Sequence, residues 1–430
     1  MNKRLLFTAA FIFVSICSFA QNGWTVCTAP KVMSRVDDIF IINGKTGYAV
    51  CGDGWIAKSI DSGNTWSTVF QDAGIYFRSV EFINEQKGFA GGFSPNQIAK
   101  DIFLRTVDGG ATWTDLTANL DPIAQFGICG LSVADSNTIY GCGNWFKDSA
   151  YIIKSTDGGN NWQTINMYQY ASSLIDMYFI NKDTGFVTGK TSDTLQTAVI
   201  LYTTDGGIHW TTKFHNTDFG EYSWKIQHLT DKIYFASIED LTTLKPSILK
   251  SVNGGMSWTK YYVDDLYYNI EGIGFIDSLR GYTGGGYDNS YESEDGGVTW
   301  KVTSICPLMD RVFRVSDSVM FATGDRIWKY QLGTKGYTGP GYNTSYTILK
   351  CYPNPVDGIL TININLPRPT RAMVTVYDNQ GRLVKTIDNA DKPAGDYSYQ
   401  LNTNNIANGT YYVLLKTHED KKVLKVMVSH

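Results

Sequence analysis

The chain has 430 residues, a formal net charge of −4 and only 18% charged residues. This weak, slightly acidic balance argues against a general nucleic-acid binder and predicts no preference for polyanions. Glycine accounts for 42 residues and aromatic residues for 14% of the chain. Because the sequence also lacks a long helical or heptad periodicity, the composition favours an all-β protein rich in turns.

Residues 1–20 have the pattern of an export signal. Two basic residues precede an apolar run that ends at Cys17, and Ser18-Phe19-Ala20 supplies the small residues that a signal peptidase requires. Cleavage is expected before Gln21. A lipoprotein would use Cys17, but the preceding Ile16 is too bulky for the small position before a lipidated cysteine. No later stretch approaches the ~18 apolar residues that span a bilayer, so we expect no transmembrane helix.

A turn motif then recurs at a near-constant interval of about 47 residues, which is typical of propeller blades and other stacked repeats. Each copy has the pattern Ser/Thr-x-Asp/Asn-x-Gly-x-x-Trp, and the copies begin at Ser59, Thr106, Ser155, Thr203, Ser251 and Ser293. Their Asp or Asn and Trp residues are Asp61, Trp66, Asp108, Trp113, Asp157, Trp162, Asp205, Trp210, Asn253, Trp258, Asp295 and Trp300.

We interpret this motif as a structural turn. The carboxylate can accept N–H bonds from its own turn, and the glycine tolerates a positive φ. The tryptophan brings a large apolar surface that pins the turn. A metal site is the alternative, but one carboxylate per turn is far short of the roughly six to eight oxygens that calcium prefers.

Strand-like segments fill the intervals between the turns. One repeat contains 174–179, 184–189 and 198–202, followed by the motif and an outgoing strand from Trp210. Four strands per unit predict a propeller blade. Six such units begin near Val36, Arg78, Ile128, Leu174, Trp224 and Gly272, and a seventh, which begins at Arg311, stops after three strands.

The missing strand of the seventh unit can come from the other end of the repeat region. Residues 22–26 resemble the outgoing stretch 297–302 of the sixth unit. We therefore predict that residues 21–332 form a closed seven-bladed β-propeller, in which the N-terminal segment is the fourth strand of blade 7. Closure of this kind removes exposed sheet edges.

Three arginines, Arg35, Arg78 and Arg311, lie at the start of the innermost strand of their units. Those units are blades 1, 2 and 7, which are neighbours in a closed ring. Their guanidinium groups would repel one another unless they are solvated or bind a carboxylate or phosphate. We predict a small site for an anion or an acidic peptide, and expect alanine at all three positions to weaken binding without unfolding the ring. Pairing with Asp37, Asp38 and Asp310 is the alternative.

Aromatic residues lie at the same strand starts, and Trp224 is among them. They could line a face that binds a sugar or peptide, or they could pack the loops. The set is Tyr76, Phe77, Phe126, Tyr222, Trp224, Tyr267 and Tyr268.

The cysteines offer little redox or metal chemistry. Cys129 and Cys142 flank a predicted turn and could form a disulfide in an oxidising compartment, or could equally be small buried residues. Neither a Cys-x-x-Cys spacing nor a histidine cluster is present. We therefore predict no cofactor and no metal.

The composition changes after Leu332. Residues 333–348 are rich in turn formers and predict a linker. A second domain over 349–430 follows, with strands expected at 360–364, 372–377, 383–387, 397–401, 409–416 and 423–428, and a hairpin turn at Asp378-Asn-Gln-Gly381. These short strands suggest a small Ig-like β-sandwich.

Four motifs stand out in this domain: Tyr352-Pro353-Asn354-Pro355, the turn ending at Gly381, the segment 408–413 with Gly409, and 421–426 with Lys422. On these motifs, residues 349–430 resemble the type A C-terminal sorting domain of the type IX secretion system of Bacteroidetes. The resemblance implies export in two steps, with the type IX machinery as partner, to the outside or the outer-membrane surface of a Gram-negative cell. It also implies removal of the domain by cleavage in the linker and attachment of the cargo to lipopolysaccharide. An accessory sandwich that binds a ligand is the alternative.

The repeat region resembles the Asp-box, or BNR, propellers. Second strands that open with Gly-Tyr or Gly-Phe are most similar to the photosystem II stability/assembly factor-like branch; the examples are Gly47-Tyr48, Gly88-Phe89, Gly185-Phe186 and Gly281-Tyr282. Because a secreted protein of this kind has no photosystem to assemble, the resemblance implies only the scaffold.

Enzymatic chemistry finds little support in the sequence. Sialidases with this turn motif usually carry a Phe/Tyr-Arg-Ile-Pro segment, which is absent here. Glucanases require two facing carboxylates; the acidic residues near the blade starts are Asp37, Asp38, Asp176, Asp264, Asp265 and Glu271. We assign no catalytic residue and expect a monomeric, secreted or cell-surface binding module for a glycan or protein. The alternatives are an extracellular glycoside hydrolase and an assembly factor for an envelope complex.

Overall fold

The computed structural model describes residues 23–95, 102–143, 150–217, 219–242, 245–264, 269–286, 290–303, 305–332, 348–366, 370–393, 395–417 and 421–430. The predicted export signal lies outside the described residues, as do positions 333–347 of the predicted linker and residues Asp265, Tyr267 and Tyr268. The chain divides into two compact units, Met1–Thr334 and Lys335–His430.

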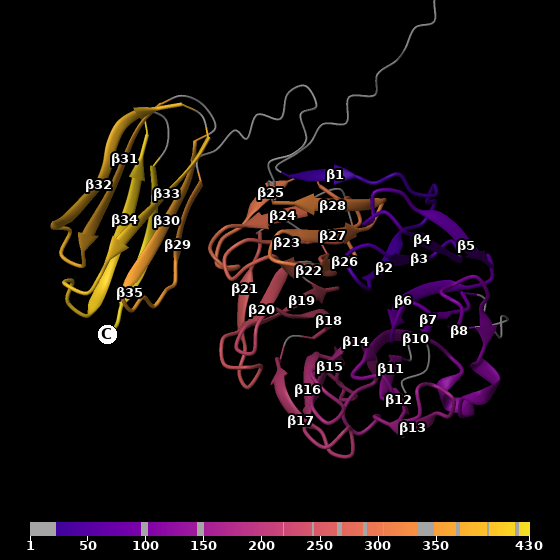
Figure 1. The fold of residues 1–430 in the computed structure, drawn as a ribbon. Coiled ribbons are helices and arrows are strands. Elements are labelled where there is room, and N and C mark those ends of the chain that lie inside the picture. Colours follow the sequence, from indigo (N-terminus) through magenta and orange to yellow (C-terminus); the bar gives the residue numbers. More distant parts are fainter. Residues whose placement is uncertain are drawn as a thin grey trace, which may run out of the picture. The chain divides into compact units, whose positions relative to one another are not determined.

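Seven four-stranded antiparallel sheets form a ring in the first unit (Figure 1). Blade 1 contains β2 (Val36–Ile41), β3 (Gly47–Cys51), β4 (Trp55–Ser59) and β5 (Ser67–Gln71). Blade 2 contains β6 (Tyr76–Phe82), β7 (Gly88–Phe93), β8 (Phe103–Thr106) and β9 (Thr114–Asp115). Blade 3 contains β10 (Ile128–Val133), β11 (Ile139–Gly143), β12 (Tyr151–Ser155) and β13 (Gln163–Asn166). Blade 4 contains β14 (Ser173–Phe179), β15 (Gly185–Lys190), β16 (Ala198–Thr203) and β17 (Thr211–His215).

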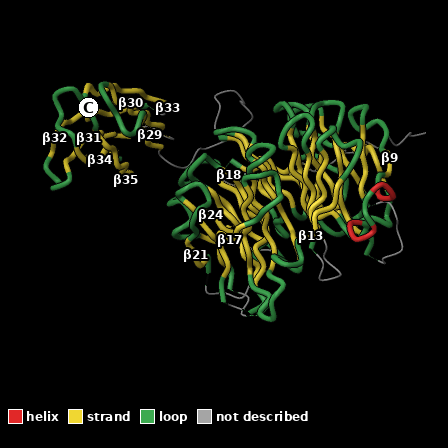
Figure 2. Tube along the Cα trace, turned by 90° about the horizontal axis from the view of Figure 1, so that it is seen from below, coloured by secondary structure: helices red, strands yellow, loops and turns green. Residues whose placement is uncertain are grey.

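The remaining blades follow the same order. Blade 5 contains β18 (Glu221–His228), β19 (Tyr234–Asp240), β20 (Ser247–Ser251) and β21 (Thr259–Tyr262). Blade 6 contains β22 (Gly272–Phe275), β23 (Gly281–Gly284), β24 (Ser290–Ser293) and β25 (Lys301–Thr303). Blade 7 combines β26 (Arg311–Arg314), β27 (Val319–Thr323) and β28 (Ile327–Gln331) with β1 (Trp24–Val26). Two short 3-10 turns, η1 (Thr117–Asn119) and η2 (Pro122–Ala124), follow β9 and are drawn in red in Figure 2.

The predicted closure of the ring is confirmed. Strand β1 pairs antiparallel with β28, with Trp24 opposite Tyr330 and Val26 opposite Trp328. The Trp24 side chain is fully buried, and its ring lies 5.1 Å from that of Tyr282 and 5.3 Å from that of Tyr330. Blade 7 therefore takes its outermost strand from the beginning of the described chain and its other three from the end of the repeat region.

The recurrent turns connect the third and fourth strands of their blades. In the first copy, the Asp61 carboxylate accepts from the backbone N–H of Asn64 at 3.1 Å and of Thr65 at 2.9 Å. Hydrogen bonds from Thr65 hold the pKa of Asp61 at about 2. The Ser59 hydroxyl donates to Asp61 at 2.8 Å, and the Trp66 indole N–H donates to the Gly63 carbonyl at 2.9 Å. Each turn is thus an internally hydrogen-bonded unit.

Glycine at the start of the second strand makes room for aromatic stacking. A Cβ added to Gly185 would lie 2.5 Å from the Phe179 ring, and that ring stacks on Tyr140 of the preceding blade with centroids 3.5 Å apart. In blade 6, a Cβ on Gly281 would lie 2.4 Å from Phe275. Glycine is required because a side chain would displace the ring that joins neighbouring blades.

A cation on the third strand links each of several blades to the turn of the next one. Lys58 Nζ donates to the Gly109 carbonyl at 2.7 Å, and Lys154 and Lys250 make the equivalent bonds at 2.8 and 2.6 Å. In the last blade, Lys329 Nζ donates to the Ser62 carbonyl of blade 1 at 2.8 Å. The same contact therefore also bridges the closure of the ring.

The second unit contains two sheets, in the orders β29-β30-β33 and β32-β31-β34-β35. The strands are β29 (Ile348–Tyr352), β30 (Ile359–Leu366), β31 (Thr370–Asp378), β32 (Leu383–Lys392), β33 (Gly395–Asn402), β34 (Gly409–Lys416) and β35 (Lys421–Val428). Buried Ile362 on one sheet and Val374 and Val413 on the other belong to a single core, as expected for a small β-sandwich. The first strand, β29, was not among the predicted ones.

Two of the sorting motifs have clear local roles in this sandwich. The Asn354 side chain accepts from the Met427 N–H at 2.8 Å and donates to the Lys425 carbonyl at 2.9 Å, so it extends the ladder along β35. Asp378 accepts from the backbone N–H of Arg382 at 2.9 Å, and Gly381 has a φ of 77° in the same turn. The Tyr352–Pro353 and Asn354–Pro355 bonds are cis.

Candidate functional site

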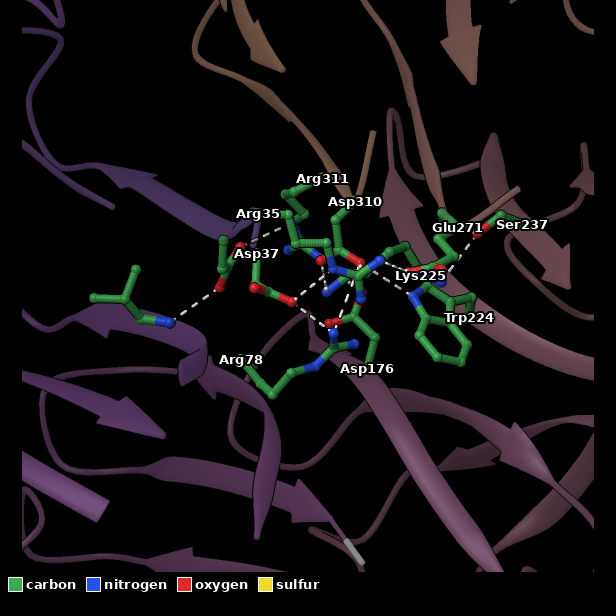
Figure 3. Close-up of polar contacts among 12 residues, drawn as sticks. Arg35, Asp37, Arg78, Asp176, Trp224, Lys225, Ser237, Glu271, Asp310 and Arg311 are labelled. Carbon is green, nitrogen blue, oxygen red and sulfur yellow. Dashed lines mark hydrogen bonds and ion pairs between the residues drawn. The ribbon is translucent and has the colours of Figure 1, made fainter. Parts of the chain in front are cut away.

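The innermost strands of blades 1 to 5 share an irregularity near their starts. The register with the second strand shifts between Val36 and Asp38, Phe77 and Ser79, Ile128 and Gly130, Leu174 and Asp176, and Ser223 and Ile226. A β-bulge re-aims the extra residue. The extra residues include Asp37, Arg78, Trp224 and Lys225, which lie together in the centre of Figure 3.

The three predicted arginines come together there, and each is paired with carboxylates. Arg35 contacts Asp37 at 3.1 Å, Glu271 at 2.5 Å and Asp310 at 3.1 Å. Arg78 contacts Asp37 at 2.6 Å. Of the three alternative partners expected from the sequence, Asp37 and Asp310 are thus engaged by these two arginines.

The third arginine makes its contacts across the ring. Arg311 on β26 contacts Asp38 of blade 1 at 3.4 Å and Asp176 of blade 4 at 2.6 Å. Lys225 of blade 5 contacts Asp310, which precedes β26, at 3.3 Å. We call these nine residues the channel cluster: Arg35, Asp37, Asp38, Arg78, Asp176, Lys225, Glu271, Asp310 and Arg311. The cluster joins six of the seven blades, and Figure 3 shows its labelled members pointing toward one another from the surrounding strands.

The cluster is largely withdrawn from solvent. The exposed fraction of the side chain is 16% for Arg35, 6% for Arg78 and 17% for Arg311. Trp224 is buried as well, with the Arg78 guanidinium 5.4 Å from its ring centre and its indole N–H 3.4 Å from Asp310. The arginines and Trp224 therefore do not form an open cationic patch, and truncation of the arginines would leave buried carboxylates without a partner. This argues against the expectation that triple alanine substitution spares the fold.

Two of the carboxylates also hold backbone groups. Asp38 accepts from the N–H of Val80 at 3.0 Å, and Asp176 accepts from the N–H of Ile226 at 3.0 Å. Each bond connects an innermost strand to that of the next blade. Asp38 and Asp176 therefore serve the ring and the cluster together. Asp38 was among the expected partners of the arginines, whereas no local pattern distinguishes Asp176 from a solvated loop carboxylate.

Burial and ion pairing divide the carboxyls of this region into two kinds. Burial alone would raise the pKa of Asp310, but Arg35, Lys225 and Arg78 hold it below its usual range. Burial raises the pKa of Glu271 to about 8 and that of Glu239, on β19, to about 7, although Arg35 opposes both shifts. Burial also raises the pKa of Asp37 to about 6 against Arg35 and Arg78. At neutral pH, Asp310 is ionised and Glu271 holds a proton.

Other candidate chemistry is sparse in the described part of the chain. Its six cysteines are free thiols, so Cys129 and Cys142 are buried residues and not a disulfide. The described residues contain no group of three or more His, Cys, Asp or Glu side chains placed to hold a metal ion. They also contain no helix that is long and apolar enough to cross a membrane.

Comparison with known proteins identifies both units at the level of fold. Residues 350–429 match the family described as secretion system C-terminal sorting domain. The structure of YCF48 bound to D1 peptide is similar, with a TM-score of 0.54 and 18% identity over 74% of this chain and 97% of that chain. YCF48 from Cyanidioschyzon merolae has a TM-score of 0.54 at 18% identity over 72% of this chain and 98% of that chain.

A GH74 xyloglucanase from Xanthomonas campestris is also similar, with a TM-score of 0.53 and 13% identity over 80% of this chain and 59% of that chain. Comparison with curated protein sequences returned no match. The sorting domain supports a secreted or cell-surface location. The chain therefore joins an all-β, seven-bladed propeller to a C-terminal sorting domain of the type IX secretion system.

Proposed function

We propose that the propeller is a binding module presented outside the cell, and that its ligand is a segment of another protein. The channel cluster carries this proposal. Its charges are paired with one another across the ring, so it is suited to holding a rigid binding face and poorly suited to a reaction that needs accessible carboxyls.

A glycoside hydrolase is the second candidate, favoured by one observation. Glu271 is protonated at neutral pH and lies close to ionised Asp310, and a glycosidase needs one carboxyl of each kind. However, Arg35 contacts both groups, and both are buried. A sugar ring has to fit between the two carboxyls of a glycosidase, so this arrangement favours binding over hydrolysis.

The choice of a protein ligand over a glycan draws on the similar YCF48 structure, which was solved with a peptide bound. If this propeller also binds a peptide, the module could assist assembly of an envelope complex. The role proposed for the sorting domain is to deliver the propeller to the type IX machinery.

The test is to apply the purified chain to an array that carries both glycans and peptides, and to analyse the bound material by mass spectrometry. We expect peptides to be retained intact. Release of shortened oligosaccharides would instead establish a hydrolase, and retention of intact glycans alone would establish a lectin-like module.

A further inference from the structure

The two sheets of the sorting domain present different side chains to the outside. Successive residues of a strand point to opposite faces of its sheet. The residues that alternate with the core positions Leu360, Ile362 and Leu401 therefore face outward from β30 and β33. They are largely polar: Thr361, Asn363, Ser398, Gln400 and Asn402. Ile359 and Tyr352, at the ends of β30 and β29, are the exceptions among the described side chains of this sheet.

The other sheet has an apolar outer side. On β31, β34 and β35, the core positions include Val374, Val413 and Val426. The apolar residues between such positions form a set with one residue of β32, which we call the apolar face: Leu383, Met373, Tyr377, Tyr412, Leu414, Val423 and Met427. A side of an antiparallel sheet that meets water normally carries polar residues. The sorting domain follows that pattern on one sheet and departs from it on the other.

The apolar face is continuous and exposed. Tyr377 lies opposite both Leu383 and Tyr412, and Leu414 lies opposite Val423. Facing residues have their Cβ atoms about 5 Å apart, so these side chains lie beside one another across all four strands. The exposed fraction is 56% for Leu383, 48% for Val423 and 37% for Tyr412. A continuous exposed patch of this kind marks an interaction site.

The charged residues that β34 and β35 add to this side are lysines. Lys425 lies opposite Tyr412, and Lys416 ends β34. Both lysines are exposed, and the two strands contain no aspartate or glutamate. Arg371 lies opposite Asp391 on the neighbouring strands, so that pair adds no net charge. The surface that complements this side is therefore apolar with carboxylates at its margin.

The backbone edge of β35 is already used by the domain itself. The Asn354 side chain bonds to the N–H of Met427 and to the carbonyl of Lys425. Val356 donates its N–H to the Met427 carbonyl at 2.8 Å and accepts from the Ser429 N–H at 3.0 Å. A partner therefore cannot add a strand along this part of β35. It has to contact the side chains of the apolar face.

We propose that the apolar face binds a component of the type IX secretion machinery whose own surface is apolar and edged by carboxylates. The inference rests on the delivery role proposed above and names the surface that performs it. Burial of Tyr412, Leu414 and Val423 supplies the affinity, and Lys416 and Lys425 select an acidic partner. A second copy of the chain is a poorer occupant, because pairing two such faces brings the lysines of both copies together.

The test is export of the full chain in a Bacteroidetes cell with a working type IX system, measured by immunoblots of the periplasm, the cell surface and the medium. The double substitution Tyr412→Ser and Val423→Ser should lower the ratio of exported to periplasmic chain about tenfold, because it removes two anchors of the interface.

A second variant tests the charge of the face. Lys416→Gln with Lys425→Gln should lower the same ratio about threefold, because these lysines lie at the margin of the contact. Gln400→Glu with Asn402→Asp is the matched control, since it changes the net charge equally on the outer side of the other sheet. Export of the control should equal that of the unaltered chain. The lysine variant keeps every apolar side chain, so it decides the question if the serine variant fails to fold.

Failure of the apolar face is distinguishable from failure of the delivery role. Removal of 349–430 should abolish export, and export of the truncated chain would refute the delivery role itself. If truncation abolishes export but both variants of the face are exported like the control, the role stands and the assignment of the face is wrong.

Two other occupants would also overturn the proposal. Normal export of the serine variant followed by its loss from the cell surface into the medium would assign the face to the lipopolysaccharide surface. Sedimentation of the purified unaltered chain should show a monomer. A dimer that dissociates in the serine variant would assign the face to a second copy.

Discussion

Arg311→Met is the substitution that tests the channel cluster most directly. Arg311 holds Asp176 at 2.6 Å and Asp38 at 3.4 Å, and both acids are buried. Methionine keeps much of the side-chain volume but leaves both carboxylates without their cation. Removing one partner of a buried pair costs about 3–5 kcal/mol. With a shift of about 2 °C per kcal/mol for a domain of this size, the melting temperature should fall by roughly 6–10 °C.

Tryptophan fluorescence reports this change from the propeller alone. All 11 tryptophans lie between Trp24 and Trp328, and the sorting domain has none. Arg326→Met is the matched control, because Arg326 is exposed and pairs with Asp325 at 3.1 Å on the same blade. An exposed pair contributes at most about 1 kcal/mol.

Asp176→Asn should restore part of the lost stability in the Arg311→Met background, because it removes one of the uncompensated charges. Equal unfolding transitions for Arg311→Met and Arg326→Met would refute the view that the cluster is a buried, mutually dependent network.

The other predictions concern closure, the turns and pH. Trp24→Ala should lower the free energy of unfolding by about 3–5 kcal/mol, measured by urea titration, whereas Met33→Ala, at an exposed position, should not. Equal urea midpoints for the two variants would contradict closure of the ring by β1. Asp295→Ala should lower the melting temperature more than Asp295→Asn, because an amide oxygen still accepts the bonds that Asn253 accepts in its own turn; the reverse order would exclude this role. Folded Glu271 keeps its proton up to about pH 8 and the unfolded group does not, so its contribution is complete at low pH and is lost as pH rises through 8. Between pH 6 and pH 9, the urea midpoint should therefore decline less in Glu271→Gln than in the unaltered protein. Parallel pH profiles of the two proteins would count against the raised pKa of Glu271.

The sequence was sufficient for the ring because its evidence is local. Each turn carries its own hydrogen-bond acceptor and its own tryptophan. The interval between turns has the length of a unit of four short strands. The segment at Trp24 could be assigned to blade 7 because it resembles another outgoing strand. Such features need no knowledge of which residues meet in space.

The channel cluster depended on contacts that the sequence does not encode locally. Arg311 and Asp176 are 135 positions apart and belong to blades on different sides of the channel. Bulges at Asp37 and Arg78 add a residue that strict alternation does not anticipate. The pairing of the arginines with nearby Asp37, Asp38 and Asp310 could thus be considered from the sequence, but the distant partners Asp176 and Glu271 could not be predicted.

The pairing of β1 with β28 has a consequence for how the molecule is made. Thr25 and Lys329, which are hydrogen-bonded partners, are 304 positions apart, so the ring closes only when both ends of the repeat region are present. The geometry of the ring does not require the two ends to meet in blade 7. A circularly permuted gene that opens the chain at the turn between β16 and β17 and joins the ends of the repeat region would describe the same torus, assembled in a different order.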